Sequence, residues 1–269
     1  MGITRKVWIA YRDTIELKEP IAIVGSSGLR SVGKLVVDEL VEKAHPRLFA
    51  DLHSYGFPSL YYGPSYLGAP SSVGVKIAKG SVVELPSVEF YAIEDRVQDI
   101  IITRGYQSYN APNQYAVADA VSDLFKELRV KKVLSLGAQV IEEGITGCAT
   151  DLDVLEELRT FGIKKTHVDR FIGFSGLVVA VGRGKGLKGA CIFANTTQNL
   201  ADPEYPDFNA AKKLLEKVGE IVELRIDTSD LEERRRREKE LMEKRREREE
   251  EQSRVKERER ERVELSGYV

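Results

Sequence analysis

The sequence predicts an α/β protein of three layers, in which a mostly parallel sheet is flanked by helices. Short apolar, β-branched runs alternate along residues 1–229 with amphipathic segments, which is the pattern of strands connected by covering helices. That length is enough for one sizeable domain with a buried core. After Ser229 the composition changes abruptly and most residues are charged, so a separate C-terminal extension is predicted.

The strand candidates are β-branched and apolar runs bounded by turn residues. They are Val7–Tyr11, Ile21–Val24, Leu48–His53, Ile100–Thr103, Val133–Leu136 and Ala190–Ala194. Val73–Ile77 and Val82–Glu84, joined through Lys79-Gly80, predict a hairpin, and Glu89–Ile93 predicts the strand that follows.

Each helix candidate places its apolar residues on one face, at a spacing near 3.6. The candidates are Ser31–Lys43, Asn113–Leu128, Asp151–Phe161 and Asn209–Val218. Gly162 and Gly219 stand where helix C-caps are expected, and Pro112 and Asp207 where helices begin. Gly173–Gly189 is open to two interpretations, because its apolar middle has strand propensity but also fits a wholly buried helix.

Tyr55–Pro70 predicts a long ordered loop rich in aromatic residues and proline. One interpretation is an interaction surface, since tyrosines are favoured at protein interfaces. That surface would be formed by Tyr55, Phe57, Tyr61, Tyr62 and Tyr66. The alternative is a loop that packs on its own core, and the sequence leaves both open.

The segment Asp230–Glu264 holds 14 acidic and 14 basic residues in 35 positions, so its net charge is zero. Subtracting these from the chain's 43 acidic and 41 basic residues leaves 29 and 27 in a nearly neutral body. Neither part has the positive excess that binding a nucleic-acid backbone requires. No apolar run approaches the roughly 18 residues that span a bilayer. We therefore expect neither nucleic acid nor membrane as a partner.

Ser229 followed by Glu232 has capping-box spacing, so a new helix is predicted to begin there. Pairs such as Glu233/Arg237 lie at i,i+4 and support a helix by a few tenths of a kcal/mol each. A helix of about 33 residues would extend roughly 50 Å; the alternative is a disordered charged tail. The predicted organisation is an α/β domain over 1–228, a charged helical extension over 229–264 and a C-terminal tail over 265–269.

Two glycine-rich motifs suggest nucleotide binding, and both depart from the required pattern. Gly28–Lys34 matches G-x-x-x-x-G-K between a strand and a helix, but Leu35 stands where the Mg²⁺-binding Ser or Thr belongs. Its glycines are explained equally well by a tight turn and close packing. Gly184–Gly189 matches G-x-G-x-x-G but runs into a strand, whereas a dinucleotide fingerprint opens a helix, so a loop is predicted.

Other ligand sites have little support in the sequence. Arg104–Gln107 follows a strand at its carboxyl end, where ligand sites of α/β proteins usually lie; the alternative is a loop packed by its tyrosine. His45, His53 and His167 are scattered, without the spacing of a metal site or a catalytic triad. We expect no catalytic residues, metal or cofactor.

The N-terminal residues lead into a strand rather than a signal-peptide hydrophobic region. Cys148 and Cys191 lack metal-type spacing. Together these features predict a reduced, cytoplasmic protein.

Three groups of motifs, in this order, resemble the proteasome assembly chaperone 2 family and its archaeal relatives. They are Ile21–Gly28 leading through Val32-Gly33 into a helix; Asp99–Gln107, a tyrosine-containing helix and Val133–Ala138; and Gly173–Leu177, Ala190–Asn195 and Asn209–Leu215. The chain departs from the family at Arg104-Gly105-Tyr106, where relatives often carry Gly-Asp or Gly-Glu before Gln.

The resemblance implies a phosphorylase/hydrolase-like α/β fold without catalytic function. It also implies that Ser175–Arg183 is a helix and that Gly184–Gly189 turns into the next strand. Self-association into a ring of three to five subunits is expected, with a tetramer favoured. The rival interpretations are a small-molecule or nucleotide-binding enzyme on the same fold, and a purely structural oligomer.

The charged extension with its penultimate tyrosine resembles archaeal members that bind and activate the 20S proteasome. Activators of this kind insert a C-terminal hydrophobic–tyrosine–any tripeptide between adjacent α subunits. By this match Gly267, Tyr268 and Val269 form the docking tail, in which the tyrosine enters the pocket and the Val269 carboxylate pairs with a basic residue. Gly267 replaces the hydrophobic residue, which predicts weaker docking or less gate opening.

Overall fold

The computed structural model describes residues 7–57, 60–61, 72–73, 76–77, 80–94, 97–105, 111–200, 202–234, 236–237 and 240. The chain divides into two units, Met1–Asp227 and Thr228–Val269. The first unit carries the sheet and its helices, and the second contains the charged segment.

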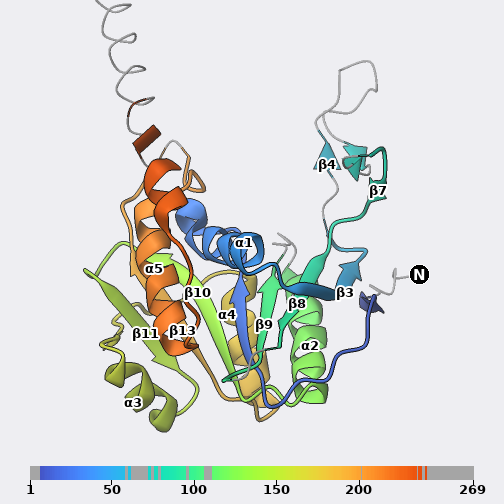
Figure 1. Ribbon diagram of the computed structural model, residues 1–269, viewed down its shortest axis with the longest axis horizontal. Helices are drawn as coiled ribbons and strands as arrows, with labels where there is room; N and C mark the ends of the chain where they lie inside the picture. The colour runs from blue at the N-terminus through green and yellow to red at the C-terminus, as the bar shows by residue number, and fades with distance from the viewer. Residues whose placement is uncertain are drawn as a thin grey trace, which may run out of the picture. The chain divides into compact units, whose positions relative to one another are not determined.

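A mixed sheet forms the centre of the first unit (Figure 1). Within the described residues it has nine strands in the order β1-β3-β8-β9-β2-β10-β13-β11-β12. The strands are β1 (Val7–Tyr11), β2 (Ile21–Gly25), β3 (Arg47–Ser54), β8 (Val88–Ile93), β9 (Ile100–Arg104), β10 (Lys132–Gln139), β11 (Ile145–Ala149), β12 (Lys164–Lys165) and β13 (Gly189–Asn195). The expected parallel pairing joins β9, β2, β10 and β13 in the middle, and antiparallel pairing attaches β8 and β11 on either side.

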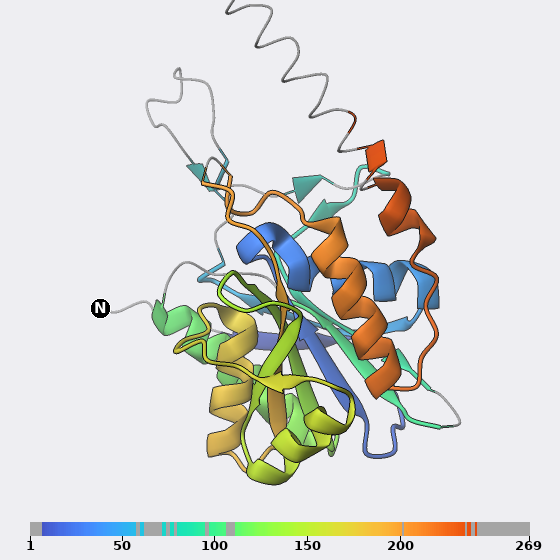
Figure 2. The same ribbon diagram turned by 90° about the vertical axis from the view of Figure 1, so that its left-hand side faces the viewer.

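Helices cover both faces of this sheet. They are α1 (Val32–Ala44), preceded by the short 3-10 helix η1 (Leu29–Ser31), α2 (Ala111–Glu127), α3 (Leu152–Thr160), α4 (Phe174–Gly184) and α5 (Phe208–Ile221). Helices α1 and α5 pack together on one face, and α2 and α4 on the other (Figures 1 and 2). The predicted α/β class and its three layers are therefore confirmed. Every residue of β2 is buried, which explains its unbroken apolar sequence.

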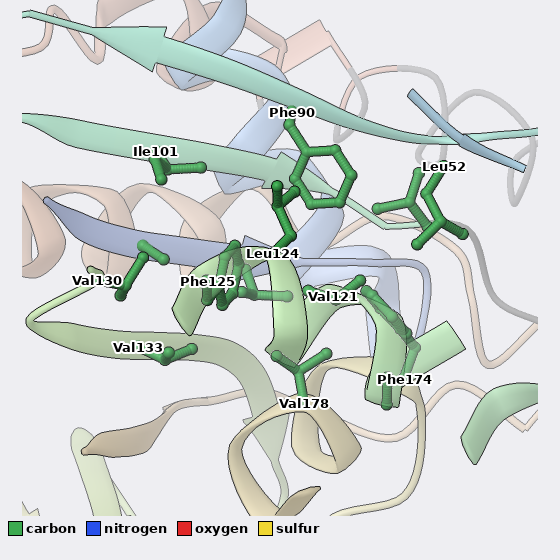
Figure 3. Close-up of a cluster of buried hydrophobic side chains, with 14 of the residues drawn as sticks. Leu52, Phe90, Ile101, Val121, Leu124, Phe125, Val130, Val133, Phe174 and Val178 are labelled. Carbon is green, nitrogen blue, oxygen red and sulfur yellow. The ribbon is translucent and has the colours of Figure 1, made fainter. Parts of the chain in front are cut away.

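The main hydrophobic core lies between the sheet and the α2/α4 layer (Figure 3). Phe125 of α2 meets Phe90 of β8 edge to face, with ring centroids 6.3 Å apart. Val121 and Leu124 of α2 and Val178 of α4 complete the contact with the sheet. Burying a side chain of this size contributes about 1.5–3 kcal/mol, so this layer fixes where the polar ends of α2 and α4 lie.

The ambiguous segment Gly173–Gly189 forms α4 and the turn into β13, as the family resemblance implied. Val178 and Val179 are buried on the face that α4 turns to the sheet and α2. Tertiary packing thus outweighs the strand propensity of the valines. Gly186 has a φ of 84° in the turn, a left-handed conformation that favours glycine.

Three of the four predicted helix boundaries agree with the structure. Asp207 caps α5, because its carboxylate accepts a hydrogen bond of 3.0 Å from the Ala210 N–H. Gly162, with a φ of 73°, follows α3, and Pro112 lies in the first turn of α2. The prediction for Gly219 was wrong, because this residue lies inside α5. A Cβ there would come within 2.6 Å of the Leu224 carbonyl oxygen, so the glycine permits a close backbone approach.

The predicted hairpin is present in a shorter form. β6 (Lys76–Ile77) pairs with β7 (Val83–Glu84), whereas Val73 belongs to β5 (Ser72–Val73), which pairs with β4 (Leu60–Tyr61). The strands β4, β11 and β12 were not predicted. β11 was missed because Gly147, Cys148 and Ala149 give it little strand propensity.

In the second unit, residues 229–234 are helical, and the Glu232 N–H donates to the Thr228 carbonyl at 3.4 Å. The predicted i,i+4 pair of Glu233 and Arg237 is formed. Whether the helix continues to 264 lies outside the described residues. Among those that are described, no helix is long and apolar enough to cross a membrane.

Candidate functional site

A candidate site lies at the carboxyl ends of β2 and β10, two neighbouring parallel strands. After β2 the chain passes to β3, β8 and β9 on one side of the sheet, and after β10 it passes to β11, β12 and β13 on the other. The strand order therefore reverses between β2 and β10. In open α/β sheets, ligands bind in the crevice at such a switch point.

A cavity of about 390 Å³ occupies this position, within the size range of small-molecule sites. Its walls come from the loop after β2, the end of β10, the segment leading into α4, and a loop before α5. The lining residues are Ser26, Ser27, Gly28, Leu29, Gly33, Leu136, Gly137, Ala138, Arg170, Phe171, Ile172, Gly173, Ser175, Pro203 and Glu204.

Two buried serines join the walls of the cavity. The hydroxyls of Ser26 and Ser175 lie 2.9 Å apart, and their residues are only 7% and 3% exposed. Ser175 is the second residue of α4, so its hydroxyl lies at the positive end of the helix dipole. Gly173 precedes the helix with a φ of 124°, which a side chain would strain. The crevice thus offers hydroxyl groups and a helix N-terminus to a small polar group.

The groups that would activate a serine nucleophile are not assembled among the described lining residues. The described lining residues include no histidine. His53 instead lies 3.3 Å from the Pro86 carbonyl oxygen, and His167 pairs with Glu142 at 2.8 Å. Among the described lining residues, Glu204 is the one that carries a carboxylate. Arg170, which also lines the cavity, pairs with Asp169 at 2.9 Å. No group of three potential metal-ligating residues occurs in the described part of the chain.

The Gly28–Lys34 loop lines this crevice, but its contacts are those of packing. A Cβ on Gly33 would lie 2.5 Å from the Leu136 carbonyl oxygen, and one on Gly25 would lie 2.2 Å from the Gly33 oxygen. Lys34 pairs with Asp38 in the next turn of α1. The lysine that would hold a phosphate in a P-loop is therefore engaged within its own helix.

Arg30 ties this loop to the segment before α5. Its side chain donates to the carbonyl oxygens of Tyr205 at 2.6 Å and Thr197 at 3.0 Å. Arg30 and Ser31 both have a positive φ, near 50°. These bonds compensate for the strained backbone and hold the crevice wall in place.

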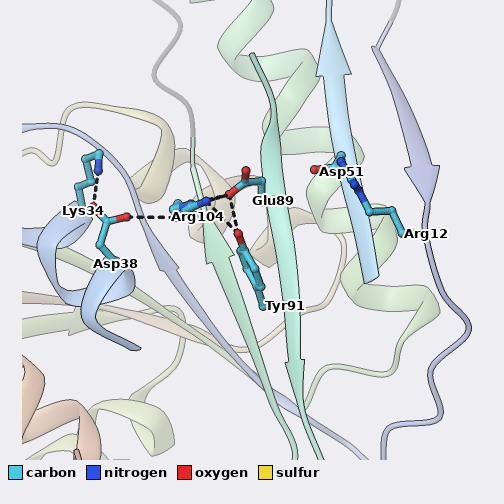
Figure 4. Close-up of polar contacts among 7 residues, drawn as sticks. All are labelled: Arg12, Lys34, Asp38, Asp51, Glu89, Tyr91 and Arg104. Atoms are coloured by element: carbon cyan, nitrogen blue, oxygen red, sulfur yellow. Dashed lines mark hydrogen bonds and ion pairs between the residues drawn. The ribbon is translucent and has the colours of Figure 1, made fainter. Parts of the chain in front are cut away.

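Arg104, at the carboxyl end of β9, belongs to a separate polar network (Figure 4). It donates to the Tyr91 hydroxyl at 2.9 Å, pairs with Glu89 on β8, and lies 3.7 Å from Asp38 on α1. Its guanidinium carbon is 5.4 Å from the centroid of the Tyr91 ring. Burial and the nearby Glu89 carboxylate raise the pKa of Tyr91, so the phenol stays protonated and donates to Glu89 at 2.9 Å.

The same network neutralises two neighbouring carboxylates. Asp51 and Glu89 face each other in the register of β3 and β8. Arg12 pairs with Asp51 and Arg104 with Glu89. Because a buried carboxylate is costly without a partner, both arginines serve the fold. In the predicted Arg104–Gln107 turn, Arg104 thus has a structural role, because it links β9 to β8 and α1. Residues 106–107 of this turn lie outside the described residues.

The predicted interface loop is described only in part. Tyr55 is 67% exposed, and its ring lies 5.2 Å from that of Trp8. Phe57 is 7% exposed and packs in the main core, so it does not contribute to an exposed surface. Tyr61 belongs to β4. The side chains of Tyr61, Tyr62 and Tyr66, and the whole of 267–269, lie outside what the structure describes.

The sequence reasoning missed the crevice residues Ser26, Phe171 and Ser175. The ring of Phe171 meets that of Phe193 at 4.8 Å and closes the cavity floor near Gly137. A serine pair directly after a buried strand and a glycine before α4 were the available clues. Neither shows by itself that β2 and α4 meet.

Comparisons with known proteins agree with this architecture. The model of the PAC2 family matches residues 22–245. An uncharacterised protein of Methanocaldococcus jannaschii is 27% identical over 238 residues, which cover 86% of this chain and 83% of the relative.

Two crystal structures from Pyrococcus furiosus share the fold. One is the structure of PbaB, an archaeal proteasome activator, which matches with a TM-score of 0.74 and 24% sequence identity. The match covers 88% of this chain and 98% of PbaB. The other is the structure of PbaA, an archaeal homolog of proteasome-assembly chaperone, which matches with a TM-score of 0.70 and 21% sequence identity. The match covers 98% of this chain and 99% of PbaA.

Proposed function

The chain belongs to the PAC2 family, and from this premise we propose that it is a cytoplasmic, non-catalytic protein that assists proteasome assembly or activates the proteasome. The observation that carries the proposal is the extent of the family match, which covers the α/β unit from residue 22 onward and continues into the charged segment, to residue 245. The fold likeness to PbaB and PbaA supports the proposal, since PbaB is an archaeal proteasome activator and PbaA is an archaeal homolog of proteasome-assembly chaperone.

We infer that docking uses the tail Gly267–Val269 on the 20S α ring. Tyr268 enters a pocket between α subunits, and the Val269 carboxylate pairs with a basic residue there. A charged segment of zero net charge suits a tether, because it cannot bury a core of its own. A buried tyrosine is a frequent hot spot, and losing one costs about 2 kcal/mol or more, or roughly 30-fold in affinity.

A single tail of this size binds weakly, because association entropy offsets most of its contact energy. We propose that a homo-oligomer, with a tetramer favoured, presents several tails to one α ring. Linked tails raise the effective concentration and can increase avidity by 10²–10⁴ when the tethers span the sites. Because Gly267 supplies no hydrophobic side chain, each tail should bind more weakly, and binding of the oligomer depends more on multivalency.

The test combines binding and gate opening. Full-length protein is mixed with archaeal 20S proteasome, and co-sedimentation is measured together with hydrolysis of a peptide whose entry is gate-limited. Tyr268→Ala is compared with Tyr268→Phe, which keeps the ring, and with Ser266→Ala as a matched tail control. Light scattering checks that the variants keep the same mass.

Tyrosine-dependent binding with faster hydrolysis supports an activator, and tyrosine-dependent binding alone supports an assembly factor. Binding that survives Tyr268→Ala would refute the docking tail while leaving the proteasome as partner. Failure of the wild-type protein to bind either the 20S particle or free α subunits would refute the proposed function.

The cavity between β2 and β10 favours a second candidate function, the binding of a small polar molecule. Nucleotides, nucleosides and inorganic phosphate are screened for an increase in thermal stability of the full chain. Ser175→Ala should abolish any such increase. Stabilisation that persists in this variant would place the ligand elsewhere.

A further inference from the structure

The two cysteines of the chain, far apart in sequence, lie opposite each other on adjacent strands. Cys148 is in β11 and Cys191 is in β13, and the two strands are antiparallel. In their register Cys148 is the partner of Cys191. Residues directly opposite in an antiparallel pair extend their side chains from the same face of the sheet.

The backbone geometry suits a bond between the two sulfur atoms. Thr150 N–H donates to the Gly189 carbonyl at 2.9 Å, and Asn195 N–H donates to the Gly144 carbonyl at 2.9 Å. Bonded pairs recur every two residues, so Cys148–Cys191 falls among the hydrogen-bonded pairs, where Cα atoms are about 5.5 Å apart. That Cα separation lies within the range seen in disulfides, and the Cβ atoms of the pair have to approach to about 4 Å for the bond to close.

The two thiols differ in environment. Cys191 is 6% exposed and belongs to the core, whereas Cys148 is exposed. A hydrogen bond from Cys191 lowers the pKa of Cys148 to about 7, and that bond together with burial raises the pKa of Cys191. Cys148 is therefore the accessible and more acidic thiol of the pair, and Cys191 is the buried and less acidic one.

We propose that Cys148 and Cys191 are a redox-active pair, in which Cys148 reacts with a hydroperoxide and Cys191 resolves the product to a cross-strand disulfide. The Cys148 thiolate attacks the outer oxygen of the peroxide, which forms a sulfenic acid and releases hydroxide or alkoxide. The sulfur of Cys191 then attacks the sulfenic sulfur, and its proton leaves with the hydroxyl group as water. The peroxide is reduced and both sulfur atoms are oxidised; a dithiol reductant restores the thiols.

The alternative is that Cys191 is an ordinary small core residue and Cys148 an ordinary exposed residue of β11. The two interpretations differ in consequence. A disulfide closes a loop of about 43 residues and ties β11 to the parallel centre of the sheet. The oxidised protein should then melt roughly 5–10 °C above the reduced protein, allowing for some strain in the bond.

The experiment uses the reduced full chain treated with stoichiometric hydrogen peroxide at pH 7.5. Intact mass, peptide mapping and alkylation of remaining thiols follow the products. We expect a loss of two mass units, a Cys148–Cys191 peptide, no alkylation, and full reversal by dithiothreitol. Cys191→Ser and Cys191→Ala should instead leave a Cys148 sulfenic acid that dimedone traps, and Cys148→Ser should leave Cys191 unmodified.

Two outcomes would overturn the proposal. One is oxidation of Cys148 to sulfinic acid, or to an intermolecular disulfide, while Cys191 stays a thiol in the wild-type chain. The other is an internal disulfide that leaves the melting temperature unchanged or lowered, which would mean that the pair is not positioned in the native sheet. Because no arm of this test uses the proteasome, its result is independent of the proposed function.

Discussion

Replacing Gly33 with alanine tests whether the Gly28–Lys34 loop is built for packing or for a ligand. Gly33 is the second residue of α1, and an added Cβ would lie 2.5 Å from the Leu136 carbonyl oxygen on β10. Side-chain carbons do not approach backbone oxygen so closely, so α1 has to move relative to the sheet. Overpacking of this kind costs about 1–3 kcal/mol, and the better helix propensity of alanine recovers up to about 1 kcal/mol.

We therefore expect Gly33→Ala to lower the free energy of unfolding by about 1–2 kcal/mol, since the clash exceeds the gain in propensity. For a domain of this size the melting temperature should fall by roughly 2–8 °C. The matched control is Gly28→Ala. Gly28 has an extended φ of 173°, and nothing lies within 4 Å of an added Cβ, so its effect should stay within about 0.5 kcal/mol.

Urea unfolding followed by circular dichroism measures both variants against the wild type, and a constant m-value shows that the midpoints report stability. An unchanged midpoint for Gly33→Ala would refute the packing argument. So would a larger loss for Gly28→Ala, because the structure leaves room for a side chain there. Magnesium-ATP should not stabilise the wild type; an increase that Gly28→Ala abolishes would restore the nucleotide interpretation.

Three further predictions concern single side chains. Arg104→Met should destabilise the fold by about 1–3 kcal/mol in urea unfolding, because Glu89 loses its cationic partner and the Tyr91 hydroxyl loses a donor. Arg104→Lys should recover less than half of this loss, and equal stability of all three proteins would contradict the network. Asp207→Ala should cost about 0.5–2 kcal/mol and Asp207→Asn less, since the amide oxygen can still cap α5. Alkylation of native Cys148 should rise with pH through a midpoint near 7 as its thiolate forms; a midpoint above 8 would refute the thiol hydrogen bond.

The layers of the fold were predictable because their patterns are local. β2 is apolar throughout since parallel central strands are buried on both faces, and α5 begins at Asp207 because its carboxylate caps the helix. Gly219 shows the limit of such reasoning. A glycine near a helix end suggests a cap, but here the residue is needed because Leu224 folds back against the helix.

The crevice and the cysteine pair depend on contacts between distant segments. Ser26 and Ser175 are 149 positions apart, and their hydroxyls meet only because α4 packs against β10, the strand beside β2. Cys148 and Cys191 become neighbours through an antiparallel strand, β11, that the sequence pattern did not predict. Without that strand, two cysteines at this spacing read as unrelated reduced thiols.

Body and tail can be separated experimentally because the proposed functions depend on different parts of the chain. Gly33→Ala alters packing between α1 and β10, so it should lower the melting temperature and leave tail-dependent docking intact while the domain is folded. Tyr268→Ala should do the reverse. A body variant that weakens docking without loss of stability or of oligomer mass would require a second contact with the proteasome, for which Tyr55 is the exposed candidate in the described loop. Each variant therefore acts as a control for the other, and additive effects in the double variant would show that the α/β unit and the tail act independently.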